Sequence, residues 1–122
     1  MKTVAIIGAS SDRSKFGNKA VRAFQQKGFE VYPVNPTELK IEGLTTYRTI
    51  LEVPTRPQKV TVYVRPHILR SLLADIATRG CDELWLNPGT ESEEVLAEAE
   101  RLNLKVIEAC SIVAIGVSPS QL

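Results

Sequence analysis

The feature that most constrains the fold is an alternation of short β-branched runs with amphipathic stretches along the chain. Lys2 to Ile7 is an almost uninterrupted apolar run, which is typical of a strand buried on both faces of a parallel sheet. Gly17 to Lys27 then places apolar residues at helical spacing, and Gly28 is suited to end that helix. Because each parallel crossover packs a helix onto the sheet, the pattern predicts a doubly wound α/β domain.

The same alternation continues along the rest of the chain. We expect further strands at Phe29–Val34, Lys59–Val64, Asp82–Leu86 and Lys105–Glu108, and further helices at His67–Arg79 and Glu91–Asn103. Thr90 or Ser92 would cap the last of these helices, whose first turn is acidic as the helix dipole favours. Between the second and third strands the pattern is weaker, with an extended piece near Gly43 and a short helix around Tyr47 to Leu51. The segment after the fifth strand carries no clear pattern.

Length and composition describe one globular domain over residues 1–122. Hydrophobic residues make up 43% and charged residues 24% of the chain, which is typical of folded rather than disordered proteins. Fifteen Lys and Arg against fourteen Asp and Glu leave a net charge of +1, which argues against a nucleic-acid partner. The longest late apolar run, Ile112–Val117, is far shorter than the roughly 20 residues of a membrane span, so we expect no membrane partner.

The residues that most often carry catalysis or bind metals are few. Cys81 and Cys110 fit neither a disulfide framework nor a zinc site, so we expect a reducing, cytoplasmic location and no metal. Both thiols are expected to be unreactive, although Cys110 follows the fifth strand, where a ligand could face it. His67 has no nucleophile or carboxylate partner evident in the sequence and is expected to begin a helix rather than act as a base. The sequence therefore predicts no catalytic residue.

Ligands of doubly wound sheets bind beyond the carboxyl ends of the strands, so the residues after each strand form the candidate site. After the first strand, Gly8 allows a tight turn, and Ser10 adds a hydroxyl before a helix whose first N–H groups can hold a phosphate. Arg13, Lys15 and Lys19 place cations nearby. A three-glycine dinucleotide fingerprint is absent, and an ordinary strand–helix turn is the alternative interpretation.

The later strand ends narrow the choice of ligand. Asn35 follows the second strand, where NAD enzymes usually place a carboxylate against the ribose. This argues against NAD, although Asn35-Pro36 is also a common turn. Arg65 follows the third strand, where a receiver domain would have its phosphoacceptor aspartate, and so excludes that class. After the fourth strand, Gly89 permits close approach of a ligand to the backbone.

A resemblance to a known family rests on four segments, Gly8–Ser10, Gly28–Pro36, Val62–Pro66 and Leu84–Gly89. In their order and spacing they resemble the single-domain CoA-binding proteins. Those are similar to the CoA-binding domain of the succinyl-CoA synthetase alpha subunit and of the NDP-forming acyl-CoA synthetases. The likeness runs from the first strand to Cys110. It implies a three-layer, Rossmann-like parallel sheet of five main strands in the order 3-2-1-4-5, and coenzyme A or acyl-CoA as the ligand.

The resemblance also implies a set of binding residues. The diphosphate would rest on the loop after the first strand and the adenosine beside the end of the second. The ends of the third and fourth strands would line the cleft and approach the pantetheine arm. The residues so implied are Gly8, Ala9, Ser10, Lys15, Phe16, Gly17, Asn18, Val34, Asn35, Pro36, Val64, Arg65, Pro66, Asn87, Pro88 and Gly89. The synthetases form a phosphohistidine in a further domain, and His67 does not lie in a matching context, so the resemblance implies binding without catalysis.

Two other functions stay open at this point. One is an NAD(P)-binding, redox-sensing domain, since a nearby Lys or Arg could receive the NADP phosphate. The other is a protein-interaction module whose nucleotide site is vestigial. The sequence also leaves open whether the CoA is free, acylated or disulfide-linked, and whether the chain forms a homodimer or binds another protein.

Overall fold

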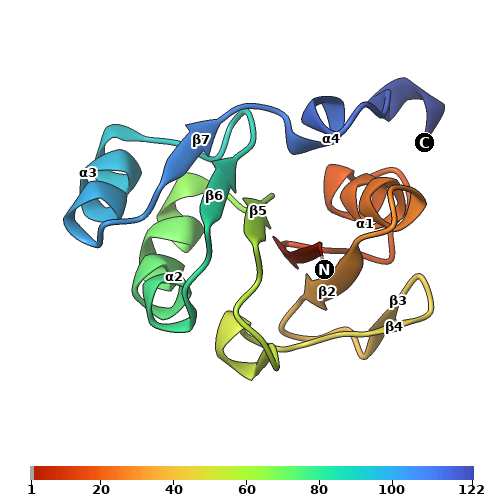
Figure 1. Ribbon diagram of the computed structural model, residues 1–122, viewed down its shortest axis with the longest axis horizontal. Coiled ribbons are helices and arrows are strands. Elements are labelled where there is room, and N and C mark those ends of the chain that lie inside the picture. The colour runs from red at the N-terminus through yellow and green to blue at the C-terminus, as the bar shows by residue number, and fades with distance from the viewer. Residues whose placement is uncertain (1) are drawn as a thin grey trace.

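The computed structural model describes residues 2–122 and places a five-stranded parallel sheet between two layers of helices (Figure 1). The strands of this sheet are β1 (Thr3–Ile7), β2 (Glu30–Val34), β5 (Lys59–Val62), β6 (Glu83–Leu86) and β7 (Val106–Glu108). A small hairpin consists of β3 (Lys40–Ile41) and β4 (Leu44–Thr45). The helices are α1 (Phe16–Gln26), α2 (Pro66–Arg79), α3 (Glu93–Arg101) and α4 (Ser111–Ala114), with 3-10 turns η1 (Ile50–Glu52) and η2 (Pro119–Gln121).

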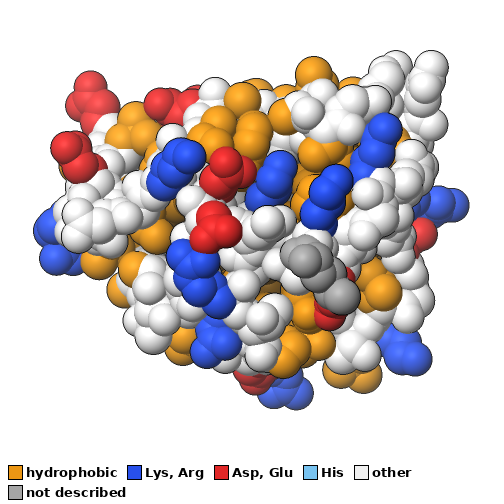
Figure 2. Space-filling model, in the orientation of Figure 1, with side chains coloured by type: hydrophobic (Ala, Val, Ile, Leu, Met, Phe, Trp, Pro, Cys, Tyr) orange, Lys and Arg blue, Asp and Glu red, His pale blue; other side chains and the backbone are white. Residues whose placement is uncertain are grey.

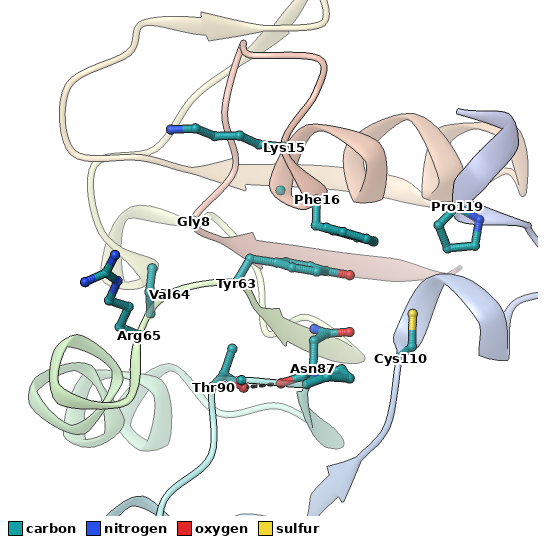
Figure 3. Close-up of a pocket in the computed structure, with 13 residues that line it drawn as sticks. Gly8, Lys15, Phe16, Tyr63, Val64, Arg65, Asn87, Thr90, Cys110 and Pro119 are labelled. Atoms are coloured by element: carbon teal, nitrogen blue, oxygen red, sulfur yellow. Dashed lines mark hydrogen bonds between the residues drawn. The ribbon is translucent and has the colours of Figure 1, made fainter.

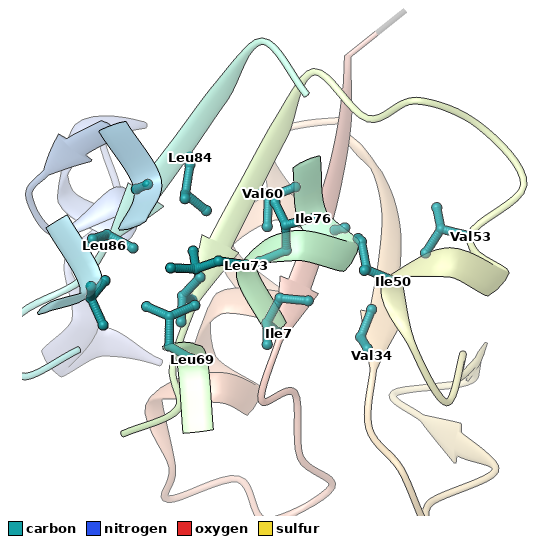
Figure 4. Close-up of a cluster of buried hydrophobic side chains, with 14 of the residues drawn as sticks. Ile7, Val34, Ile50, Val53, Val60, Leu69, Leu73, Ile76, Leu84 and Leu86 are labelled. Carbon is teal, nitrogen blue, oxygen red and sulfur yellow. The ribbon is translucent and has the colours of Figure 1, made fainter. Parts of the chain in front are cut away.

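One face of the sheet is covered by α2, α3 and η1. Leu69, Leu73 and Ile76 form the buried stripe of α2, and Figure 4 shows them against Val60 and Leu84 of the central strands. The three α2 residues stand at helical spacing, which turns them all toward the sheet. This face holds the larger of the two apolar clusters and fixes α2 beside the end of β5.

The other face is covered by α1 and α4. Val4 and Ile6 of β1 point to this side, whereas Ala5 and Ile7 point to the α2 side. Phe24 of α1 is fully buried against them. Because successive strand residues face opposite layers, the uninterrupted apolar run of β1 serves both cores. The α/β, doubly wound and Rossmann-like prediction is thereby confirmed.

The predicted strand order is wrong. The observed order is β2-β1-β5-β6-β7, so the third main strand pairs with β1 and does not lie outside β2. Pro33 gives the physical reason, because it has no N–H to donate and is excluded from the middle of a sheet. On the outer edge of β2, Tyr47 donates its N–H to the Pro33 carbonyl and accepts the Asn35 N–H, both at 2.9 Å. β2 is therefore an edge strand.

Smaller differences concern the loops. The short helix expected around Tyr47 to Leu51 is instead η1, because Tyr47 is held by β2. The extended piece near Gly43 is the turn of the β3–β4 hairpin. Of the two caps considered for α3, Ser92 is the one used, accepting the Val95 N–H at 3.1 Å. No helix within residues 2–122 is long and apolar enough to cross a membrane.

Candidate ligand-binding cleft

The direction of chain winding changes between β1 and β5. β1 leads to α1 on one face of the sheet, and β5 leads to α2 on the other. The loops that leave the carboxyl ends of these two strands therefore run in opposite directions. The crevice between them is the usual ligand site of such sheets. A cleft of about 680 Å³ lies there. Its lining residues are Gly8, Lys15, Phe16, Gly17, Tyr63, Val64, Arg65, Asn87, Pro88, Gly89, Thr90, Cys110 and Pro119 (Figure 3).

Two glycines bring the start of α1 against the loop that follows β1. Gly8 has a φ of +87°, and a Cβ there would lie 3.0 Å from the carbonyl carbon and oxygen of Tyr63. A Cβ at Gly17 would lie only 2.0 Å from the Gly8 oxygen. Both positions therefore require glycine, one for its conformation and both for space. The result is a helix N-terminus held at the floor of the cleft.

The cations near this loop have different roles. Lys15 is the N-cap residue of α1, offers no side-chain cap and lines the cleft. Arg13 is paired with Glu42, with 3.5 Å between Nε and Oε2. The Lys19 ammonium lies over the Phe16 ring, 5.1 Å from its centroid. Of the three cations predicted near this loop, Lys15 is the one that lines the cleft.

The loop between β1 and α1 is ordered by its own polar groups. Asp12 accepts the Ser14 N–H at 3.0 Å and the Ser14 hydroxyl at 2.6 Å. These bonds, with Lys15 nearby, hold the pKa of the Asp12 carboxyl below its usual value. Ser10 accepts the Asp12 N–H at 3.0 Å. The Ser10 hydroxyl oxygen thus accepts a bond within the loop, and its predicted contact with a phosphate stays a prediction.

The end of β2 lies outside the cleft lining. Val34 is buried and Pro36 is exposed, while the Asn35 amide donates to the Ala9 carbonyl at 2.9 Å. The Asn35 Oδ1 accepts the backbone N–H groups of Thr37 and Glu38. Asn35 thus fastens this turn to the first loop, and its predicted contact with adenosine stays a prediction.

Asn18 also has a structural role. Its side chain is fully buried and donates to the Ser10 carbonyl at 2.9 Å and to Glu42 at 3.0 Å. The backbone N–H of Asn18 is bonded to the Lys15 carbonyl. Ala9 is buried as well, so neither residue offers a side chain to the cleft. The predicted residues outside the lining are Ala9, Ser10, Asn18, Val34, Asn35, Pro36 and Pro66.

Asn87 holds the wall opposite α1 together. Its amide donates to the Thr61 hydroxyl at 2.7 Å and to the Val62 carbonyl at 2.8 Å, and its Oδ1 accepts the Ser111 N–H at 2.9 Å. The Ser111 hydroxyl bonds to Thr61 at 2.7 Å and to the Tyr63 hydroxyl at 3.1 Å. Both amide atoms of Asn87 are therefore bonded inside the protein, although the residue lines the cleft, and its predicted approach to the pantetheine arm stays a prediction.

Three lining residues were missed from the sequence. Tyr63 lies within a strand pattern that gave no sign of where its hydroxyl points, and burial raises its pKa to about 12. Thr90 was considered only as a helix cap, yet its hydroxyl donates to the Asn87 carbonyl at 2.7 Å. Pro119 belongs to η2, in the segment that had no assignment. Cys110, left open above, is a half-buried free thiol that lines the cleft.

The two ends of the cleft differ in chemistry. Figure 3 shows Lys15 and Arg65 on one side, and Phe16, Cys110 and Pro119 on the other. No carboxylate or imidazole stands among the described residues that line the cleft. The arrangement can thus hold an extended ligand that is anionic at one end and apolar at the other.

Comparisons with known proteins agree with this geometry. A family model described as a CoA binding domain matches residues 2–116. The acetate–CoA ligase [ADP-forming] II of Archaeoglobus fulgidus is 34% identical over 119 residues, which cover 94% of this chain and 18% of the ligase. The chain thus spans under a fifth of that relative's length.

Solved structures of the same kind are similar throughout the chain. A conserved hypothetical protein from Pyrococcus furiosus has a TM-score of 0.86 at 32% identity, covering 93% of this chain and 99% of that one. The dinucleotide forming acetyl-coenzyme A synthetase 1 of Ca. Korarchaeum cryptofilum has a TM-score of 0.76 at 25% identity. The match covers 88% of this chain and 25% of that one. The resemblance read from the sequence is confirmed, and the chain belongs to the CoA binding domain family, related to the CoA-binding part of acyl-CoA synthetases.

Proposed function

We propose that this chain binds coenzyme A or acyl-CoA in the cleft and performs no reaction on it. The observation that carries the proposal is the polarity of the cleft, with Lys15 and Arg65 at one end and Phe16, Cys110 and Pro119 at the other. CoA has the same polarity, since its phosphates and its thiol are at opposite ends. The diphosphate would lie by Lys15 and the start of α1, where helix N–H groups favour anions.

Binding without catalysis is supported by the state of the polar groups around the cleft. The Tyr63 phenol, whose pKa burial raises from 10 to about 12, is protonated near neutral pH. The Asn87 amide makes hydrogen bonds inside the protein. His67 lies outside the lining, on the exposed first turn of α2. These groups hold the shape of a site rather than supply an acid, a base or a nucleophile.

The test is calorimetric titration with CoA of the wild type, Lys15→Glu and Lys40→Glu. Both substitutions change the net charge equally, and Lys40 is an exposed residue outside the cleft. Loss of a charge-assisted phosphate contact costs about 1.5–3 kcal/mol, so Lys15→Glu should weaken binding at least about tenfold. The Lys40→Glu variant should bind as the wild type does. Equal affinities for all three proteins would refute the cleft as the CoA site.

NAD(P) remains a second candidate because of Glu38. The Glu38 carboxylate follows the β2 end by four residues and accepts the Ser11 N–H at 3.0 Å and the Asn35 amide at 3.2 Å. A carboxylate near this strand end is the group that grips the ribose in NAD proteins. Competition separates the two: NAD or NADP that displaces CoA at comparable concentration would favour the second candidate. Absence of binding by all three ligands would leave the protein-interaction module.

A further inference from the structure

A second cavity, of about 310 Å³, opens near the amino ends of β1, β2 and β5, at the edge of the sheet opposite the cleft. We name it the lysine cavity. Its lining residues are Lys2, Lys27, Phe29, Gln58, Lys59 and Ile115. Three lysine side chains thus line one small space, and no carboxylate is among these lining residues. Figure 2 shows Lys and Arg side chains gathered on this face between β5 and α4.

Aromatic rings, rather than carboxylates, orient two of these ammonium groups. The Nζ atoms of Lys2 and Lys59 each lie 5.6 Å from the centroid of the Phe29 ring. Lys59 also lies 5.1 Å from the centroid of the Trp85 ring. Phe29 is itself fixed edge-to-face on Phe24, with 4.9 Å between centroids. A cation–π contact holds a lysine without neutralising it, so the charge stays available to a ligand.

The acidic residues around the lysine cavity are engaged with other groups. Glu83 stands opposite Lys59 in the strand register, but its oxygens accept the Trp85 indole N–H at 3.1 Å and approach Lys105 at 3.9 Å. Asp82 lines an adjoining pocket with Gln58, Lys59 and Glu83, and it is paired with the Arg56 guanidinium. Glu30 accepts the Tyr32 hydroxyl. Within residues 2–122, none of the three lysines of the cavity has a carboxylate within 4.0 Å. Positive charge is therefore concentrated here in a chain whose net charge is only +1.

We propose that the lysine cavity binds a compact oligophosphate anion. Each ammonium is a point charge with three N–H donors, and three of them around one space match a multiply charged anion better than a single carboxylate. The lining comes from three segments, the start of β1, the α1–β2 turn and the start of β5, closed by Ile115 after α4. This site is independent of the proposed CoA cleft, because it lies at the other edge of the sheet.

The test is a titration of the ¹⁵N-labelled protein with inorganic tripolyphosphate at low ionic strength. The amide signals of Lys2, Phe29 and Ile115 should shift in a saturable way, with the cleft first filled by excess CoA. The triple variant K2Q/K27Q/K59Q should bind about tenfold more weakly. Its matched control, K40Q/R48Q/R70Q, removes the same charge at exposed residues outside the lysine cavity and should keep the wild-type affinity. A parallel titration with ATP shows whether the lysine cavity has the higher affinity for a free oligophosphate or for the phosphate tail of a nucleotide.

A double variant serves as the control for effects on stability. Lys2 and Lys27 are both exposed, so K2Q/K27Q should fold as the wild type does and weaken binding about threefold. Thermal melts of every variant check that the differences in affinity do not come from loss of folded protein. Shifts confined to Gly8 and Gly17, or equal affinities for the triple variant and its control, would overturn the proposal.

Discussion

The Oδ1 atom of Asn87 accepts the backbone N–H of Ser111 at 2.9 Å and so joins the end of β6 to the start of α4. Asn87 is only 3% exposed, and its amide also donates to β5 at the Thr61 hydroxyl and the Val62 carbonyl. Three segments that form one wall of the cleft therefore meet at a single side chain. That side chain positions the site without needing to touch a ligand.

Asn87→Ala should lower the free energy of unfolding by about 2–4 kcal/mol, because buried donors and acceptors on three segments lose their partner. Urea denaturation measures the change. Gln26→Ala, at an exposed position at the end of α1, is the matched control and should lie within about 0.5 kcal/mol of the wild type. A value for Asn87→Ala as small as that of the control would contradict the role assigned to this network.

Gly17→Ala separates local propensity from close packing. Alanine is the better helix former by about 1 kcal/mol, so propensity alone predicts stabilisation. The 2.0 Å approach of a Cβ to the Gly8 oxygen predicts instead a loss of about 1–3 kcal/mol and weaker CoA binding, since the α1 N-terminus must move. Denaturant unfolding and calorimetry measure the two effects.

Gly28→Ala is the control for the Gly17 change. Gly28 has a φ of +78°, but a methyl group added there would have nothing within 4 Å. The variant should therefore lose about 1 kcal/mol from strain and keep its CoA affinity. If Gly17→Ala were more stable than the wild type, the close approach would not limit the structure.

The two thiols should respond differently to N-ethylmaleimide. Burial raises the pKa of Cys81 to about 11, so about one thiol in a thousand is ionised at pH 8 and alkylation should be slow. Cys110 lines the cleft, and bound CoA should slow its alkylation several-fold while leaving Cys81 unchanged. Peptide mass spectrometry over time gives both rates. Equal protection of both cysteines, or of neither, would count against a ligand lying along Cys110.

Alkaline pH should destabilise the protein partly through Tyr63. Burial raises its pKa from 10 to about 12, so between these values the unfolded chain loses the phenolic proton before the folded one does. The free energy of unfolding is therefore unaffected by this group below pH 10 and falls as the pH rises toward 12. Tyr63→Phe should lose less stability over that window than the wild type, in urea titrations at pH 9, 10 and 11.

Gln26→Ala serves as the control for the alkaline series, because Gln26 is exposed at the end of α1 and has no titratable group. Its stability should decline with pH in parallel with the wild type. Parallel curves for Tyr63→Phe as well would show that the Tyr63 phenol does not carry the effect.

Local patterns were sufficient for the elements and for part of the cleft. The uninterrupted apolar run of β1 predicted a strand, because β1 is buried on both faces. The spacing of Leu69, Leu73 and Ile76 predicted a helix, because one stripe of α2 is buried. Gly8 could be recognised as a tight turn after a strand. Pro33 is a local signal for an edge strand, and it conflicts with the strand order implied by the resemblance.

The chain by itself determined the five main strands and the helices α1, α2 and α3, because those depend on neighbours a few residues apart. Only the tertiary structure decided which strand lies beside β1, that Asn35 and Asn87 turn their amides inward, and that Tyr63 and Pro119 reach the cleft. It also gathered Lys2, Lys27 and Lys59 around one space. These outcomes depend on contacts between residues far apart along the chain, for which a single sequence holds no periodic signal.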